Sequence, residues 1–269
     1  MAKTTGTETA LTTTLDNSLL QPLDVPRAGY PALQASKYKN LSEDSIIKLG
    51  LSTSAVDLLG ADTLAKLYPE TMSVKYDKEE EMFYVPHSRI RWVPLHFPKK
   101  YIEDSSGERR VYRPIGGDWN DKCKSVCRLL LAAVDGDELV TDEQGDPAVF
   151  GLTLRGMKTQ RITGKEGSLL SLNAALCKRH GVTTPSYMGH LVSMEITCKV
   201  SEFSSAADSS KTSLGADYVF AKASLLPPAI QAATTALVRE DSRLMAAIAD
   251  PFGIGASSPV LLEDGDYLF

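Results

Sequence analysis

The spacing of hydrophobic positions along this chain changes several times, and it predicts helices placed around a central set of strands. Between residues 41 and 67, an acidic turn after Ser42 precedes Ile46, Ile47, Leu49 and Leu51. An acidic first turn followed by apolar positions is typical of a helix N-terminus. We therefore expect one helix that ends near Gly60 and a second, short helix over 61–67.

From residue 71 the apolar positions alternate with polar ones, which is the pattern of half-buried strands. A charged turn after Tyr76 separates two such stretches and predicts a hairpin. Two apolar runs, one from Cys123 and one from Val149, are expected to be buried strands joined by an acidic loop. The predicted strands cover residues 72–76, 82–85, 89–97, 109–113, 123–134, 149–161, 191–203 and 218–223.

Two longer helices are expected in the second half of the chain. Ser168 is placed to cap a helix over 168–180, and Gly181 follows its end. Pro227 and Pro228 stand where a helix tolerates proline and would open a helix over 229–249, which Pro251 would stop.

This order of elements predicts an α+β protein rather than alternating βαβ units. The expected architecture is an antiparallel, partly closed oligonucleotide-binding (OB)-like β-barrel with an inserted helix, N-terminal helices and a C-terminal helix. We divide the chain into an extended or flexible arm (1–36), a single α+β domain (37–250) with its OB-like core at about 71–225, and an acidic C-terminal tail (251–269).

Composition and charge narrow the possible functions only slightly. The chain has 269 residues, of which 43% are hydrophobic, and it lacks the basic and apolar N-terminal segments of a signal peptide, so a cytoplasmic location without membrane attachment is expected. Residues 89–179 hold 16 Lys and Arg against 12 Asp and Glu, hence +4, which leaves −9 for the rest of a chain whose total is −5. A basic middle with acidic flanks suits a polyanionic ligand, and it is also common in proteins without one.

The four cysteines are too few for a disulfide framework in a chain of this length. Cys123, Cys127, Cys177 and His180 are the set that could bind zinc. If Cys123 and Cys127 share a strand, however, their Cα atoms lie about 13 Å apart, too far for one zinc ion. We predict no metal and no cofactor, and only a turn or helix at Cys123 would reopen the zinc alternative.

Common catalytic motifs are absent from the sequence. Gly164 precedes Lys165, but the position five residues before Gly164 is Thr159, so the phosphate-binding loop pattern fails. Neither the nucleophile elbow, nor the zinc-protease motif, nor the dinucleotide fingerprint occurs. We predict that the protein is not an enzyme, although a site assembled from distant residues would escape such a search.

Basic and aromatic residues interleave along the predicted strands of the central region. Single-stranded nucleic acid binds to grooves that combine cations for phosphates with aromatic rings for bases. The alternative is that the rings are core residues and the cations only solvate the surface. The predicted nucleic-acid-binding residues are Arg89, Arg91, Lys99, Lys100, Arg110, Tyr112, Arg113, Lys124, Arg128, Arg155, Lys158 and Arg161.

The last residues of the chain are acidic and include two aromatic residues. Such a tail can occupy a basic groove of its own protein or bind replication and recombination partners, and the alternative is an ordinary acidic end. The tail residues predicted to bind partners are Asp264, Asp266, Tyr267 and Phe269.

Three segments together carry a resemblance to a known group of proteins. They are Val93-Pro-Leu-His-Phe-Pro-Lys-Lys-Tyr-Ile-Glu, Lys122-Cys-Lys-Ser-Val-Cys-Arg-Leu-Leu-Leu and Phe150-Gly-Leu-Thr-Leu-Arg-Gly. Over about residues 85–225 the chain resembles single-stranded-DNA-binding-like proteins of phages and plasmids, and its Phe269 tail is similar to those of single-stranded-DNA-binding proteins. The resemblance implies an OB-like fold without catalysis, a role in DNA replication or recombination, and a groove lined by Ile90–Phe97 and Arg155–Arg161.

The sequence therefore predicts non-catalytic binding of single-stranded nucleic acid, DNA or RNA, with DNA favoured. The alternative function is that of a structural or assembly subunit of a virus particle or another large complex, and a homo-oligomer fits either function. In that alternative, the N-terminal arm and the helix over 229–249 would form subunit interfaces.

Overall fold

The structure is a computed structural model of the chain. It describes residues 30–35, 41–52, 59–60, 63–67, 76–77, 82–84, 90–107, 110–116, 119–182, 187–204 and 210–254. Arg89, the first 29 residues and the acidic residues Asp264 and Asp266 with Tyr267 and Phe269 lie outside this part. Among the described residues, no helix is both long enough and apolar enough to cross a membrane.

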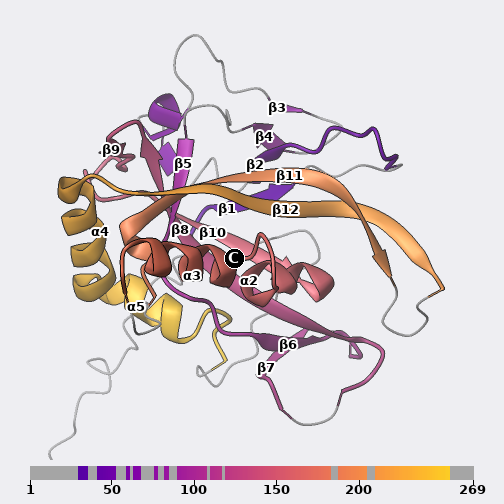
Figure 1. Ribbon diagram of the computed structural model, residues 1–269. Coiled ribbons are helices and arrows are strands. Elements are labelled where there is room, and N and C mark those ends of the chain that lie inside the picture. The colour runs from indigo at the N-terminus through magenta and orange to yellow at the C-terminus, as the bar shows by residue number, and fades with distance from the viewer. Residues whose placement is uncertain are drawn as a thin grey trace, which may run out of the picture.

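The described residues form one sheet of twelve strands together with several helices, so the fold is α+β as expected (Figure 1). The strands are β1 (Ala32–Ala35), β2 (Leu49–Ser52), β3 (Tyr76–Asp77), β4 (Met82–Tyr84), β5 (Ile90–Pro94), β6 (Tyr101–Asp104), β7 (Val111–Pro114), β8 (Cys123–Asp135), β9 (Glu138–Leu139), β10 (Val149–Arg155), β11 (Val192–Ser204) and β12 (Thr212–Leu225). The helices are α2 (Gln160–Thr163), α3 (Leu169–Arg179), α4 (Pro228–Glu240) and α5 (Ser242–Ala249), with 3-10 turns at Gly156–Thr159 and Gly189–Leu191.

The long strand β8 organises the sheet. The main strand order is β12-β11-β5-β8-β10-β1-β2-β4-β3, and β6 and β9 also pair with β8. Along β8, alternate residues enter two different hydrophobic cores: Leu129 and Leu131 point to one face, whereas Leu130 and Ala132 point to the other. The apolar run that predicted a buried strand is therefore buried on both faces.

The sheet is a strongly curled half-barrel. The backbone N–H of Ala35 in β1 donates to the hydroxyl of Tyr218 in β12, at 3.1 Å, although four strands separate β1 from β12 in the sheet order. The inner face holds the larger core, which contains Trp92 and Phe150 and is closed on one side by α2 and α3. Helices α4 and α5 cover part of the outer face through the second core.

The sheet is mixed rather than wholly antiparallel, which corrects one part of the expected architecture. Strand β1 pairs with β10 in parallel, with Ala32 opposite Gly151, and it pairs with β2 in the antiparallel sense. Strand β1 lies within residues 1–36, so the end of the predicted arm belongs to the sheet. Because β10 is far from β1 in the sequence, no local pattern of residues predicts that the two strands pair.

Three predicted boundaries are wrong for local reasons. Residues Leu49–Ser52 form strand β2 and not a helix, because Leu49 and Leu51 are both buried and alternate with period two. Strand β10 ends at Arg155, since Gly156 adopts a φ of +59° and turns the chain into the 3-10 turn that precedes α2. The predicted helix 229–249 is two helices, separated at Asp241, whose extended backbone and carboxylate cap α5.

Other elements are confirmed close to their predicted limits. Helix α3 begins after Ser168, whose hydroxyl accepts from the backbone N–H of Ser171 at 3.1 Å, and Gly181 follows with a φ of +69°. Residues 63–67 are helical, and β3 and β4 form the expected hairpin.

Strands β5 and β10, the two halves of the predicted groove, flank β8 on opposite edges and are not direct neighbours.

Candidate nucleic-acid interface

The outer face of the sheet brings together three of the predicted binding residues. Tyr112 of β7 is opposite Glu103 of β6, which is in turn opposite Lys124 of β8. Paired residues of neighbouring strands share a face. Arg155, at the end of β10, reaches the same place and donates from Nε to Glu103 Oε2 at 2.7 Å. We name Tyr112, Lys124 and Arg155, with Glu103 between them, the outer-face cluster.

Glu103 is the central residue of this cluster. Its side chain is buried, whereas that of Arg155 is 31% exposed, so the pair lies at the boundary between core and solvent. Burial opposes the charge on Arg155, but the hydrogen bond and the charge of Glu103 prevail and raise the pKa of its guanidinium. Burial and the negative charge of Glu103 raise the pKa of the Tyr112 hydroxyl, which is therefore protonated at neutral pH.

Aromatic rings extend the cluster on the same face. Phe252, which follows α5, stacks on Tyr112 with ring centroids 4.6 Å apart and planes 10° apart. The same ring meets the edge of Tyr101 at 5.3 Å and 74°. Sequence reasoning singled out Tyr112 but gave no signal for Phe252, because its position depends on how the chain folds back after α5.

A second group of predicted residues, Lys158 and Arg161, lies beside the inner face, near the carboxylate of Asp217. Arg161 of α2 donates from Nε to Asp217 Oδ1 at 3.1 Å and to Oδ2 at 3.0 Å. Asp217 is buried and also accepts from Ser201 and from the backbone N–H of Tyr218. The hydrogen bond to Asp217 raises the pKa of the Arg161 guanidinium.

Lys158 approaches the same inner group. Its ammonium lies 5.9 Å from the centroid of the Tyr218 ring. Burial lowers the pKa of Lys158, and the nearby carboxylate of Asp217 acts in the opposite direction. Lys158 and Arg161 thus belong to a compact polar group that joins the turn after β10 to β12, and they lie apart from the outer-face cluster.

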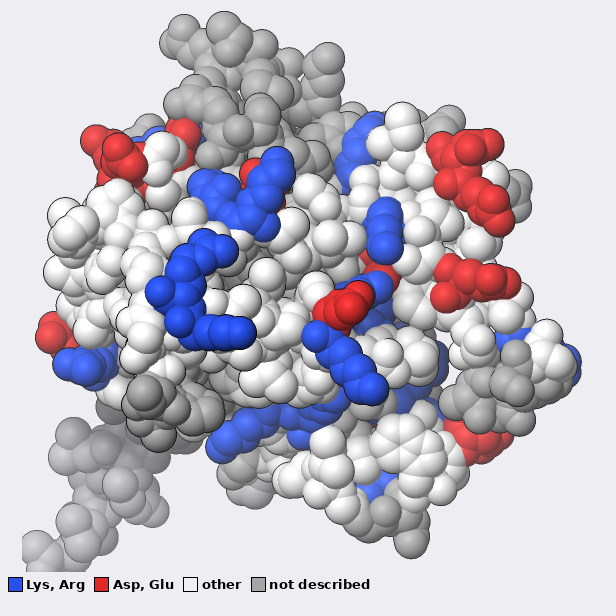
Figure 2. Space-filling view, in the orientation of Figure 1, with Lys and Arg blue, Asp and Glu red and all other residues white. Residues whose placement is uncertain are grey.

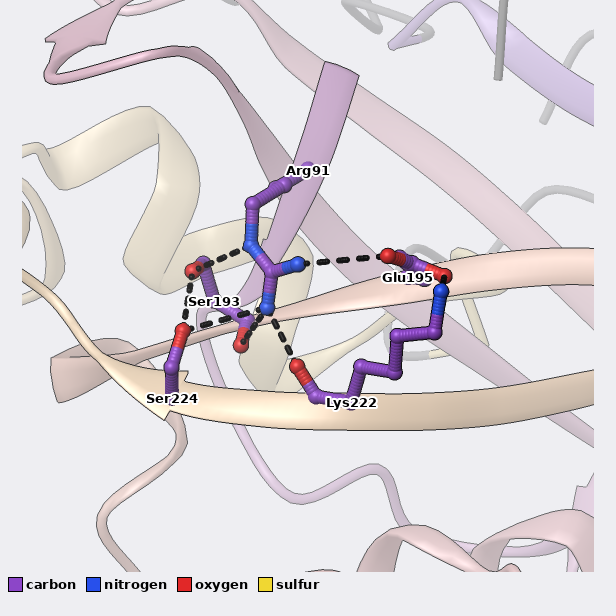
Figure 3. A network of polar contacts seen from close by, with 5 residues as sticks. All are labelled: Arg91, Ser193, Glu195, Lys222 and Ser224. Atoms are coloured by element: carbon purple, nitrogen blue, oxygen red, sulfur yellow. Dashed lines mark hydrogen bonds and ion pairs between the residues drawn. The ribbon is translucent and has the colours of Figure 1, made fainter. Parts of the chain in front are cut away.

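Arg91 forms a third, separate arrangement (Figure 3). Its guanidinium donates to the hydroxyl of Ser193 at 3.0 Å, to the carbonyl of Lys222 and to the hydroxyl of Ser224 at 3.1 Å. It also pairs with Glu195, at 3.5 Å. These contacts tie β5 to both strands of the β11–β12 ribbon, next to a register shift between Ser193 and Glu195.

Lys222 shows that the ribbon is strained at this point. It is the one non-glycine residue with positive φ in the described part of the chain, at +50°. Such a backbone conformation is unfavourable for a lysine and persists only where surrounding contacts hold it. The Arg91 donors supply those contacts, so we assign Arg91 to the fold rather than to a ligand.

The remaining predicted residues are dispersed. Lys99 and Arg110 are exposed, and Lys100 donates to the Thr163 hydroxyl at 2.8 Å. Arg113 donates to the carbonyl of Gly116 at 2.9 Å.

Arg128 is buried beneath the outer face. Its Nη1 donates to the carbonyl of Pro251 at 3.4 Å. Burial lowers its pKa to about 10. A phosphate on the surface cannot reach this guanidinium directly.

The front face in Figure 2 carries α2, α3 and the β11–β12 ribbon, and there Lys and Arg side chains form separate patches rather than one stripe. Asp and Glu lie mainly toward the margins of the same face. The eleven predicted residues in the described part of the chain therefore do not form a single groove: the structure unites three of them and distributes the other eight.

The four cysteines are free thiols, and three of them are buried. Cys123 and Cys127 lie in the single strand β8, and Cys177 lies in α3. Burial raises the pKa of the Cys127 and Cys198 thiols to about 12, so both are protonated at neutral pH. The described part of the chain contains no group of three or more His, Cys, Asp or Glu arranged to hold a metal ion.

Comparison of the chain with protein-family models, with curated proteins and with solved structures found no match. The resemblance to single-stranded-DNA-binding-like proteins thus stays a prediction.

Proposed function

We propose that this protein binds single-stranded nucleic acid, with DNA favoured, on the outer face of its curled sheet. The observation that carries the proposal is the outer-face cluster: Tyr112, Lys124 and Arg155 reach one place from three different strands. A ring for stacking beside two cations for phosphates is the combination that non-sequence-specific single-strand binding requires. We further propose that the curled sheet serves as an OB-like platform in replication or recombination, without catalysis.

The cations of the cluster differ in how readily they meet a phosphate. Lys124 is exposed, and an ammonium keeps its three donors free to rotate toward an anion. Arg155 uses its Nε–H on Glu103, but guanidinium groups have five N–H donors and this side chain is partly exposed. The exposed residues Arg110 and Lys99 provide further positive charge for the approach of a polyanion.

The test is fluorescence anisotropy of a labelled single-stranded oligonucleotide at several salt concentrations, with the duplex as control. We expect strand-selective binding whose log affinity falls linearly with log salt, by about 0.7 for each phosphate neutralised. Lys124→Ala should lower that slope by about 0.7, and Tyr112→Leu should weaken binding by about 1–3 kcal/mol. Lys178→Ala is the matched control, since it removes the same charge from an exposed position on α3.

Two results would refute this function. Absence of binding at low salt would remove it entirely. Binding that Lys124→Ala and Lys178→Ala weaken equally would show that only the total charge matters, and the outer-face cluster would lose its role.

The alternative function, that of an assembly subunit, is favoured by a different observation, on the hairpin formed by β6 and β7. Val111 and Ile115 are 57% and 61% exposed, and Trp119 is 57% exposed. They lie on or just after β7, an edge strand that pairs with β6. Exposed apolar side chains on an open strand edge favour association between chains. Light scattering after size-exclusion chromatography separates the two functions, because an assembly subunit forms a large particle without nucleic acid.

A further inference from the structure

The ring of Phe252 already covers one face of Tyr112. The two rings are nearly parallel, at 10°, with centroids 4.6 Å apart, and Tyr101 contacts Phe252 edge-on at 5.3 Å. This is the geometry that a nucleobase adopts on an aromatic side chain. Tyr101 and Tyr112 thus form a slot that accepts a planar ring, and in this structure the ring comes from the chain itself.

The segment that carries Phe252 begins with a tight turn at its junction with α5. Asp250 closes a tight turn, in which its carboxylate accepts from the backbone N–H of Ile254 at 2.7 Å. Gly253 has a φ of +67°, which a turn of this kind requires. The hydrogen bond from Arg128 to the Pro251 carbonyl is 3.4 Å long, beyond the usual 2.7–3.2 Å range.

The surroundings of the slot fit a nucleotide better than an arbitrary aromatic ligand. Arg155 is paired with Glu103, which lies opposite Tyr112 on the neighbouring strand, so a cation lies at the rim of the slot. Lys124 is on the same face of the adjoining strands. A base inserted beside Tyr112 would therefore bring its phosphate toward positive charge.

We propose that the slot formed by Tyr101 and Tyr112 is a binding site for one unstacked nucleobase, and that Phe252 fills it in the ligand-free protein and is displaced when single-stranded nucleic acid binds. This inference rests on the proposed function. It adds the position of a base, a second aromatic contact at Tyr101, and a self-blocking ring.

The expected effect follows from competition between the two rings. A stack between aromatic side chains corresponds to a factor of about two to ten in an equilibrium constant. If the slot is open for only a fraction of the time, the apparent dissociation constant rises by the inverse of that fraction. Removal of the Phe252 ring should therefore tighten binding by about two- to tenfold.

The experiment compares Phe252→Leu with the wild type, using an oligonucleotide that contains the fluorescent base 2-aminopurine. Leucine keeps an apolar side chain against the sheet but cannot stack, so the fold is retained. We expect tighter binding and stronger quenching of 2-aminopurine, because the base now stacks on Tyr112 without a competitor. Ile254→Ala is the control in the same segment, and it should leave affinity and quenching unchanged.

A second pair of variants distinguishes competition from a general loosening of the segment. In a Tyr112→Leu background the slot no longer exists, so Phe252→Leu should have no further effect on affinity. If Phe252→Leu weakens binding, leaves it unchanged, or tightens it equally with and without Tyr112, the inference is wrong while the proposed function stands. If neither the wild type nor Phe252→Leu binds at low salt, the proposed function fails and the inference falls with it.

Discussion

Acidification should destabilise the protein through one buried histidine, His96. Strand β5 ends at Pro94, yet the backbone ladder with β8 continues: the N–H of Leu95 donates to the carbonyl of Leu130 at 3.0 Å. The N–H of Leu130 then donates to Nε2 of His96 at 3.2 Å. The imidazole takes the place of a backbone acceptor, and it can do so only while Nε2 carries no proton.

The environment of His96 sets the magnitude of the effect. Burial lowers its pKa from 6.5 to about 4, and the positive charge of Arg128 acts in the same direction. Between these two pKa values the unfolded chain binds a proton that the folded protein does not. Stability from His96 is therefore complete above pH 6.5 and is lost as the pH falls toward 4. At about 1.4 kcal/mol per pH unit, the loss amounts to about 3 kcal/mol.

Urea unfolding of the wild type and of His96→Gln over this pH range measures the effect. Glutamine can accept the Leu130 N–H through its side-chain oxygen, but it does not titrate. Other acids contribute equally to both proteins, so the difference between the two unfolding free energies isolates His96. We expect the unfolding free energy of the wild type to fall by about 3 kcal/mol relative to that of His96→Gln as the pH falls from 6.5 to 4. Two curves that stay parallel across this range would refute the argument.

Three further substitutions test the contacts that shape the two faces, each by urea unfolding at neutral pH. Arg161→Ala should cost about 1.5–3 kcal/mol, because it removes the charge-assisted hydrogen bonds of the buried Asp217 carboxylate. Gly151→Ala should cost about 1–3 kcal/mol, since its Cβ would lie 2.8 Å from Nη2 of Arg128. Asp241→Ala removes the cap of α5 and should cost about 1 kcal/mol. Unchanged unfolding midpoints would contradict the corresponding contacts.

Local signals predicted those parts of the fold that depend on nearby residues. Ser168 and Gly181 bracket α3 because a capping hydroxyl and a left-handed glycine act within one turn of the helix. The apolar run after Cys123 predicted β8 because a strand buried on both faces needs no alternation. At Leu49 and Leu51 the same kind of reasoning failed, since four residues are too few to separate period two from period 3.6.

The candidate site was predictable in its residue types but not in its arrangement. Tyr112, Lys124 and Arg155 were among the expected binding residues, and strand pairing brings them to one face. The sequence does not show that Glu103, 52 residues before Arg155, lies between them. Nor does it show that Phe252 folds back onto Tyr112. Both contacts are set by long-range pairing and not by local spacing.

Several of the predicted cations form ion pairs within the fold, so a count of charged residues in the sequence overestimates how many cations are available to a ligand. Arg91, Arg155 and Arg161 each have an acidic partner within the fold, at Glu195, Glu103 and Asp217 respectively. A guanidinium suits this role because it is planar, offers several donors and is weakly hydrated, whereas an ammonium is strongly hydrated and keeps to the surface.

Lys99 and Lys124 are exposed, as is Arg110, so these three would be the first cations of the predicted set to meet the proposed polyanionic ligand. The exposed cations and the paired arginines should therefore be detected by different measurements. Neutralising Lys124 should change the salt dependence of binding and hardly affect unfolding, whereas replacing Arg91 or Arg161 should change unfolding first. A proposed binding surface on this chain is therefore best judged by which cations are exposed rather than held in an ion pair with a buried carboxylate, and on that basis Lys124 carries more weight than Arg161.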